Sequence, residues 1–212
     1  MTIVAYVVLT AAMIGLGLVV TNIVSGPSGW DVEVNRWFET RRTGAWDDVS
    51  HYGSMIADTI TVIAAAAFVV FILGCVKCWR EIGFLAIALL LEVTVFVSTT
   101  FFVDRNRPDV LRLDDTPPTS SYPSGHTAAA VVLYVGLAII VTNRVHNPVV
   151  RAVVWMLAVL GPLAVAGSRL YRGMHFPTDV ASGVLLGGAC IAIALFAVRT
   201  AVATTTAGEV TA

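Results

Sequence analysis

Residues 83–103 read GFLAIALLLEVTVFVSTTFFV, and residues 104–108, which follow at once, read DRNRP. The first stretch is apolar over almost its whole length and ends where charged residues begin. A hydrocarbon core about 30 Å thick needs roughly 20 apolar residues per helix, so this stretch predicts a helix that crosses a membrane. Its one acidic residue, Glu92, lies near the middle, which marks it either as a functional group or as a protonated or hydrogen-bonded packing group.

Further apolar runs of similar length occur on both sides of this stretch. The sequence is 57% hydrophobic and only 13% charged, with a mean hydropathy of +0.83, which is too apolar for an ordinary soluble domain. We therefore predict an all-α, polytopic membrane protein that forms a single domain over residues 1–212. Its six transmembrane helices are expected at about 3–24, 57–76, 83–103, 125–142, 150–168 and 178–199, with a flexible tail over 201–212.

The first apolar run lacks the positive residues that begin a secretory signal and is long enough to span, so we expect a retained helix. The longest polar stretch, 25–57, comes next. Its apolar residues mix helical and alternating spacing, and its tryptophans suit the headgroup zone. We predict one short helix there that lies in the membrane interface, either as a lid or packing element or as a gate for lipid.

Charge and cysteine content exclude several functions. The net charge of −1 is not concentrated in a basic tract, so nucleic acid is not an expected partner. Cys75, Cys78 and Cys190 fall within or at the end of apolar runs, where free cysteine behaves as a small hydrophobic residue. No carboxylate cluster suggests a metal site, and we expect no cofactor. The sequence does not specify an oligomeric state.

Two histidine-centred clusters and a pair of arginines occur where apolar runs stop. Alternation of the spans places all three segments on one side of the membrane. A set of cations at that depth suits an anionic ligand, and phosphate fits best. The clusters are Tyr122-Pro123-Ser124-Gly125-His126, Ser168-Arg169 with His175 and Asp179, and the Arg105, Arg107 and Pro108 segment.

Each cluster suggests a part of a phosphate site. Ser124 is an expected N-cap, and the amides that follow at Gly125 can approach phosphoryl oxygens. His126 can then donate a proton to a leaving oxygen. Pro177 disfavours a helix through His175, so His175 and Asp179 are expected to pair across a turn. A carboxylate on one imidazole nitrogen leaves the other free to attack.

These residues and spacings resemble the type 2 phosphatidic acid phosphatase superfamily over Thr100 to Asp179. The resemblance implies that His175 is a nucleophile that forms a phosphohistidine, that Asp179 orients it, and that His126 is the general acid. It further implies phosphate binding by Arg107, Ser124, Gly125 and Arg169. The family has a lysine where this sequence has Thr100, and our hypothesis is that Arg105 supplies the missing charge.

The resemblance implies hydrolysis of a phosphate monoester or diphosphate on a membrane lipid, without a metal ion. Polyprenyl diphosphate, phosphatidate and phosphatidylglycerophosphate are comparable substrates. The alternatives are a lipid-binding or transport protein with a degenerate site, and a lipid phosphotransferase. The expected location is the bacterial cell membrane, with the lipid bilayer as partner and the site on the extracytoplasmic face. Two titrating histidines predict a bell-shaped dependence of activity on pH.

Overall fold

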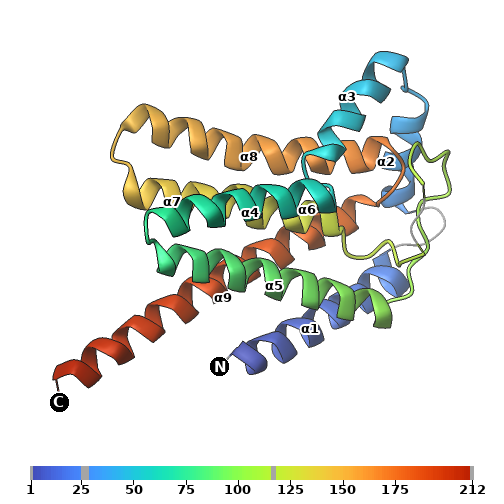
Figure 1. Cartoon of the computed structure of the whole chain (residues 1–212). Coiled ribbons are helices and arrows are strands. Elements are labelled where there is room, and N and C mark those ends of the chain that lie inside the picture. Colours follow the sequence, from blue (N-terminus) through green and yellow to red (C-terminus); the bar gives the residue numbers. More distant parts are fainter. Residues whose placement is uncertain (1, 25–28, 116–117, 211–212) are drawn as a thin grey trace.

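The computed structural model describes residues 2–24, 29–115 and 118–210, and over these residues the chain is helical with no strand. Figure 1 shows the long helices lying side by side, with two short helices and a long loop gathered at one end. The elements are α1 (Thr2–Val19), which continues as a π-helical turn (Val20–Val24), α2 (Trp30–Glu39), α3 (Gly44–Met55), α4 (Thr59–Cys75), α5 (Trp79–Phe102), α6 (Gly125–Ala130), a second π-helical turn (Val131–Val135), α7 (Gly136–Arg144), α8 (Pro148–Tyr171) and α9 (Pro177–Val210).

Five stretches are long and apolar enough to cross a membrane on their own: Ile3–Ile23, Trp79–Phe102, Gly125–Arg144, Pro148–Tyr171 and Pro177–Ala201. A sixth span exists only if α3 and α4, which are bent by 45° at their junction, count as one. The chain is thus an integral membrane protein with five or six candidate spans.

The polar stretch predicted to hold one short helix contains two, α2 and α3. The side chain of Thr43 accepts a hydrogen bond from the Trp46 amide and so begins a new helix after α2 has ended. At the other end of the chain, where a flexible tail was predicted from residue 201, α9 continues as helix to Val210. Residues 211–212 lie outside the described part.

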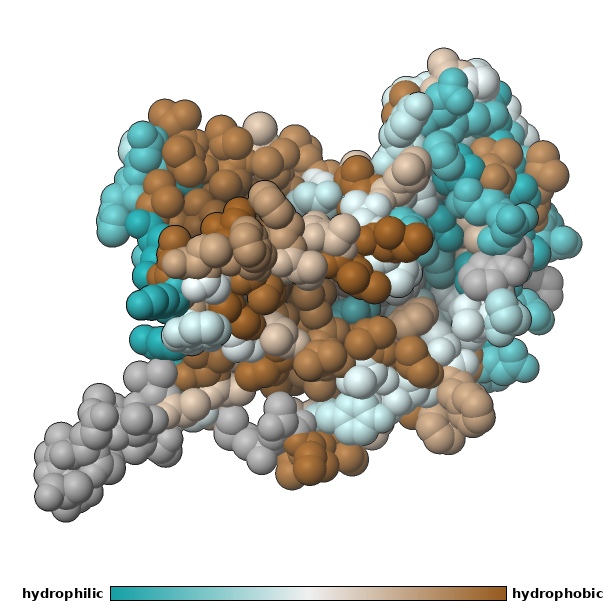
Figure 2. Space-filling model, viewed as in Figure 1, coloured by the Kyte–Doolittle hydropathy of each residue, from teal (hydrophilic) through white to brown (hydrophobic). Residues whose placement is uncertain are grey.

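The core lies between α5, α9, α1 and the α6–α7 rod. Leu85, Val95, Val132 and Leu186 are almost fully buried there. Glu92 is only 5% exposed, so it faces the bundle and not the lipid. Cys78 and Cys190 are buried, Cys75 is exposed, and all three are free thiols. Figure 2 shows a hydrophobic surface over the bundle and hydrophilic surface at both ends, most of it around α2 and α3.

Candidate active site

The three motif-bearing segments meet at the end of the bundle that carries α2 and α3, as the alternation of the spans predicted. The Ser124 amide at the start of α6 donates to the Asp179 carbonyl of α9 at 3.0 Å. The Leu113 amide of the loop over 103–124 donates to the Arg172 carbonyl after α8 at 3.2 Å. Residues far apart in sequence therefore form one site at one end of the molecule.

A tight turn after α8 places His175. Gly173 has a φ of +71°, a conformation that L side chains rarely adopt. The amides of Gly173 and Met174 donate to the carbonyls of Leu170 and Arg169, which closes the helix end. A Cβ at Gly173 would also lie 2.8 Å from a Val110 methyl carbon. Helix α9 then begins at Pro177, so His175 lies in the turn between two helices, as predicted.

His175 is 4% exposed, and its Nδ1 lies 2.7 Å from the carbonyl oxygen of Ser121. A carbonyl only accepts hydrogen bonds, so Nδ1 carries the proton and Nε2 keeps its lone pair. Burial lowers the pKa of His175 below its usual value; Asp179 opposes this shift, and the charges of Arg169 and Arg107 add to it. The imidazole is therefore neutral at neutral pH, the form a nucleophile needs.

The carboxylate of Asp179 supports His175 from 3.8 Å, an ion-pair distance and not a hydrogen bond. This differs from the direct carboxylate–imidazole bond suggested by the sequence, because both oxygens of Asp179 have other donors. Oδ2 accepts from the Ser121 hydroxyl at 2.8 Å and from the Phe176 amide at 2.9 Å. Oδ1 accepts from Arg105. Asp179 thus fixes both segments that contact the imidazole.

The second cluster begins α6 as predicted, with Ser124 at the N-cap position. The Ser124 hydroxyl is hydrogen-bonded to the Thr127 hydroxyl at 2.9 Å and does not bond the helix amides. A Cβ at Gly125 would lie 2.9 Å from the ring of Phe96, so a larger residue here would require that ring of α5 to shift. The His126 side chain is 28% exposed, and its Nε2 lies 3.8 Å from a carboxylate oxygen of Asp58.

Two arginines present buried donors to the same region. Nη1 of Arg107 donates to the Met174 carbonyl at 2.7 Å, and burial lowers the pKa of Arg107. Nη1 of Arg169 donates to the Ser54 hydroxyl at 2.8 Å. In the described part of the chain, Nε of each guanidinium is buried without a hydrogen-bond partner. Buried unpaired donors are costly, so both arginines are suited to an anion.

Arg105 does not join these two arginines. Its guanidinium is buried between the carboxylates of Asp31 and Asp179 and stacks 4.3 Å from the ring centre of Phe176. Thr100, in the last turn of α5, donates its hydroxyl to the Val97 carbonyl at 2.9 Å. We predicted that Arg105 supplies the charge of the family lysine. Its guanidinium instead lies between Asp31 and Asp179, away from Arg107 and Arg169.

Sequence reasoning missed Asp114 as part of this region, because an acidic loop between two motifs is typical of solvated side chains. Asp114 accepts from Arg169 at 2.9 Å and from Nε of Arg172 at 2.8 Å. Burial raises the pKa of Asp114, but the bond from Arg172 and the charges of Arg169, Arg172 and His51 outweigh it and hold that pKa below its usual value. Acidic loop residues give no sign of such partners in the sequence.

Two residues of α2 were also missed. Asp31 and Asn35 have no exposed surface; Asn35 donates to the His175 carbonyl, and Asp31 pairs with Arg105. Their spacing of four residues places them on one face of the helix, but nothing in the sequence indicates what that face meets. Over residues 2–24, 29–115 and 118–210, no three His, Cys, Asp or Glu side chains gather closely enough to hold a metal ion.

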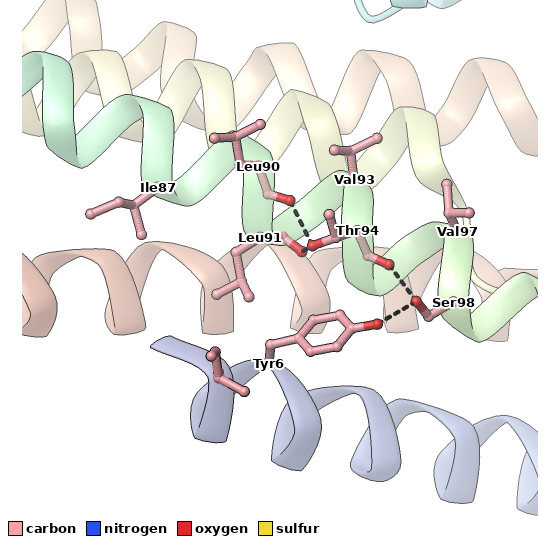
Figure 3. A pocket seen from close by; sticks show the side chains of 9 residues that line it. Tyr6, Ile87, Leu90, Leu91, Val93, Thr94, Val97 and Ser98 are labelled. Carbon is pink, nitrogen blue, oxygen red and sulfur yellow. Dashed lines mark hydrogen bonds between the residues drawn. The ribbon is translucent and has the colours of Figure 1, made fainter. Parts of the chain in front are cut away.

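A separate apolar pocket of about 620 Å³, open to the surface, lies between α1 and α5 (Figure 3). Apolar side chains such as Ile87, Leu90 and Val97 line it, and the Tyr6 hydroxyl bonds that of Ser98 at 2.7 Å. None of the candidate site residues lines this pocket. Its walls have no group suited to chemistry on phosphate, so the site is assigned from the histidines and arginines alone.

Comparisons with known proteins bear on the same segments. A family model described as the PAP2 superfamily matches residues 80–203. The chain is 31% identical over 114 residues to an undecaprenyl-diphosphatase of Sulfolobus acidocaldarius, which covers 51% of each chain. It is 34% identical over 91 residues to phosphatidylglycerophosphatase B of Bacillus subtilis, which covers 41% of this chain and 42% of that protein. The matches therefore span about half the length of these curated relatives or less.

Solved structures agree in fold over a longer range. The crystal structure of a transmembrane PAP2-type phosphatidylglycerolphosphate phosphatase from Bacillus subtilis matches with a TM-score of 0.72 at 20% identity and covers 94% of both chains. Aquifex aeolicus LpxE matches with a TM-score of 0.64 at 23% identity, over 82% of this chain and 99% of that one. With the family match over more than half of its sequence, the chain belongs to the PAP2 superfamily.

Proposed function

We propose that this protein hydrolyses a phosphate monoester or diphosphate on a membrane lipid through a phosphohistidine at His175, without a metal ion. One observation carries the proposal. A buried histidine, with the Nδ1 proton held by a carbonyl, lies within electrostatic range of two arginines that have buried unpaired donors. This combination provides a neutral nucleophile together with positive charge for the phosphoryl oxygens.

In the first step, Nε2 of His175 attacks phosphorus, and the bond from phosphorus to the leaving oxygen breaks. His126 gives its proton to that oxygen. Arg107, Arg169, Ser124 and the Gly125 amide stabilise the negative charge on the three equatorial oxygens. The partial positive charge that develops on the imidazole is stabilised by Asp179, 3.8 Å from Nδ1.

In the second step, water attacks the phosphorus of the phosphohistidine and loses a proton to His126. The nitrogen–phosphorus bond breaks, phosphate leaves and His175 returns to its neutral form. If a lipid alcohol took the place of water, the same residues would catalyse phosphotransfer. We propose that water is the acceptor. Product analysis with and without added lipid alcohols tests that point.

A lipid is the proposed substrate because the site lies at the end of an apolar bundle, where a headgroup can enter while its tail stays in the bilayer. The names of two relatives give undecaprenyl diphosphate and phosphatidylglycerophosphate as the substrates of those proteins. The proposed substrates of this protein are these two lipid classes and phosphatidate. We place the site on the extracytoplasmic face of a bacterial cell membrane.

The direct test is a phosphate-release screen over lipid monophosphates and diphosphates in mixed micelles, with chelator and with vanadate. The expected result is release that resists chelator and is inhibited by vanadate, with loss of at least about 1000-fold in His175→Ala, since removing a covalent nucleophile costs that much or more. Equal and slow release by both chains from every lipid would instead favour a lipid-binding protein.

A further inference from the structure

A buried line of charges runs from helix α2 to the carboxylate behind His175. The carboxylate of Asp31 accepts from Nη2 of Arg105 at 2.8 Å, and Nη1 of the same guanidinium donates to Asp179. Thr178 joins the line, because its hydroxyl accepts from Arg105 at 2.8 Å and donates to Asp31 at 2.6 Å. Asp31 and Asp179 have no exposed surface, and Arg105 has 4%.

Helix α2 makes a second contact one turn later. Asn35 is fully buried, and its side-chain amide donates to the His175 carbonyl at 3.0 Å. The opposite face of α2 carries the exposed residues Glu33, Arg36 and Trp37. One face of α2 is thus hydrogen-bonded both to His175 and to Arg105, the cation that pairs with Asp179.

Stability alone does not explain this arrangement. Removing two carboxylates and a guanidinium from water is expensive, and apolar side chains of similar volume commonly hold helices together as well or better. The line of charges does, however, determine the electrostatic potential at His175. Asp31, Arg105 and Asp179 together carry one net negative charge on the Nδ1 side of the ring, where a positive charge forms when Nε2 attacks.

We propose that Asp31 is a positioning residue for the phosphatase reaction, which acts on His175 through Arg105 and Asp179. The inference rests on the proposed phosphohistidine mechanism and adds to it a residue outside all three motifs. Through Arg105, the carboxylate of Asp31 on α2 contributes to the net charge on the Nδ1 side of His175. The place of Arg105 between two carboxylates also explains why it lies away from the phosphate side of the site.

The direction of the effect follows from the charged groups around His175. These come from every element packed against it: Asp179 on α9, Arg169 on α8, His126 on α6, Asp31 on α2, and Arg105 and Arg107 on the loop over 103–124. Asp31→Asn changes only one of them and makes the line of charges neutral. The imidazolium then becomes harder to form, so attack slows, and the pH at which His175 becomes protonated falls.

The test uses the full-length chain in mixed micelles with phosphatidate, phosphatidylglycerophosphate and farnesyl diphosphate as probes. The probe hydrolysed fastest by wild type is used to measure kcat, KM and the acid limb of the pH profile. Glu33→Gln removes an exposed carboxylate of the same helix and is the matched charge control. Thr178→Val removes the hydroxyl from the line and leaves its charges, so it controls for local packing.

For Asp31→Asn we expect kcat to fall about 10- to 100-fold, the range seen for outer-shell partners of metal-bound histidines, with KM little changed. Its acid limb moves to lower pH. Glu33→Gln keeps wild-type values, and Thr178→Val keeps the wild-type acid limb even where it lowers Tm. The double variant Asp31→Asn/Arg105→Gln restores one net negative charge and returns the acid limb toward wild type, which gives a readout if the single variant folds poorly.

A wild-type kcat and acid limb in Asp31→Asn, with active wild type and Glu33→Gln, overturn this inference and leave the proposed function standing. The inference also fails if Thr178→Val moves the acid limb as far as Asp31→Asn, because packing and not charge is then responsible. A wild-type chain that releases no phosphate from any probe overturns the proposed function, and this inference with it.

Discussion

At the scale of single residues, the function of each side chain depends on which of its polar atoms are already hydrogen-bonded within the protein and which can still contact substrate. Nδ1 of His175 is occupied by the Ser121 carbonyl, so only Nε2 can react. Both oxygens of Asp179 are occupied, so it acts on the ring by charge. Arg107 and Arg169 use one terminal nitrogen each on the protein and keep buried donors for an anion.

The pH dependence of the rate follows from His175. The neutral imidazole attacks, so activity is lost as the pH falls through the pKa of His175 in the folded protein. Burial lowers that pKa below its usual value in the free enzyme, so we expect the acid midpoint of kcat/KM to lie below about pH 6.5. The alkaline limb is expected in kcat, which reports the loss of the His126 proton in the enzyme–substrate complex. Rates that stay flat from about pH 5 to 9 would contradict these roles.

Asp114 is expected to matter for stability through the two arginines that it joins. Asp114→Asn removes the negative charge that pairs with the guanidinium groups of Arg169 and Arg172, each less than a tenth exposed. We expect the unfolding free energy to fall by about 1–3 kcal/mol, the cost of a buried charged donor that loses its partner. Thermal unfolding in detergent measures this. Asp115→Asn, at the exposed neighbouring position, is the control, and an equal change in both variants would refute the assignment.

The residue scale also shows where sequence reasoning stops. The motif residues and their order along the chain were enough to place His175, Asp179, His126, Arg107 and Arg169 in one region. The role of Arg105 was not predictable, because its second partner, Asp31, belongs to a helix whose contacts the spacing of residues does not define.

At the scale of elements, the close approach of α9 to α6 holds the two halves of the site together. A Cβ at Gly183 would lie 2.5 Å from the Ser124 carbonyl oxygen, and one at Gly187 would lie 2.8 Å from that of Ala128. Both obstacles are backbone atoms, which cannot move without shifting a helix. The glycines of α9 therefore set the distance between Asp179 and the start of α6.

Gly183→Ala should push these helices apart. We expect a lower Tm, from about 1–3 kcal/mol of overpacking, together with reduced phosphate release. Gly188→Ala is the matched control on the same helix, since nothing lies within 4 Å of its added Cβ, and alanine there should leave activity intact and favour the helix by up to about 1 kcal/mol. If both variants behave alike, close packing at Gly183 does not position the site.

The elements also show why the apolar runs were easier to predict than the polar segment. A membrane span is set by length and hydropathy, so most predicted helices agree with the observed ones to within a few residues. The segment between the first two spans has no such constraint. It forms α2 and α3, whose packing depends on partners such as Tyr171, which donates to Asp47 at 2.8 Å.

At the scale of the whole molecule, the chemistry is gathered at one end of an apolar bundle (Figures 1 and 2). Successive spans run in opposite directions, which brings the segments 104–124 and 172–176 to the same end. The order of the apolar runs in the sequence was therefore enough to predict that these segments meet. The proposed extracytoplasmic location of that end can be measured in intact bacterial cells.

For this measurement, Asp109→Cys is introduced at an exposed position of the loop, in a chain whose three natural cysteines are replaced by alanine. A membrane-impermeant maleimide should label this cysteine in intact cells. Lys77→Cys, at the exposed turn of the opposite end, should be labelled only after the cells are opened. The reverse pattern would place the site in the cytoplasm.

The central claim, a covalent phosphohistidine at His175, is tested most directly by acid-free rapid quenching of the enzyme with a lipid substrate that carries radiolabelled phosphate. The account predicts label on the wild-type chain in an acid-labile, alkali-stable bond that maps to His175, and none on His175→Ala. Label on another residue, or full turnover by His175→Ala, would contradict it.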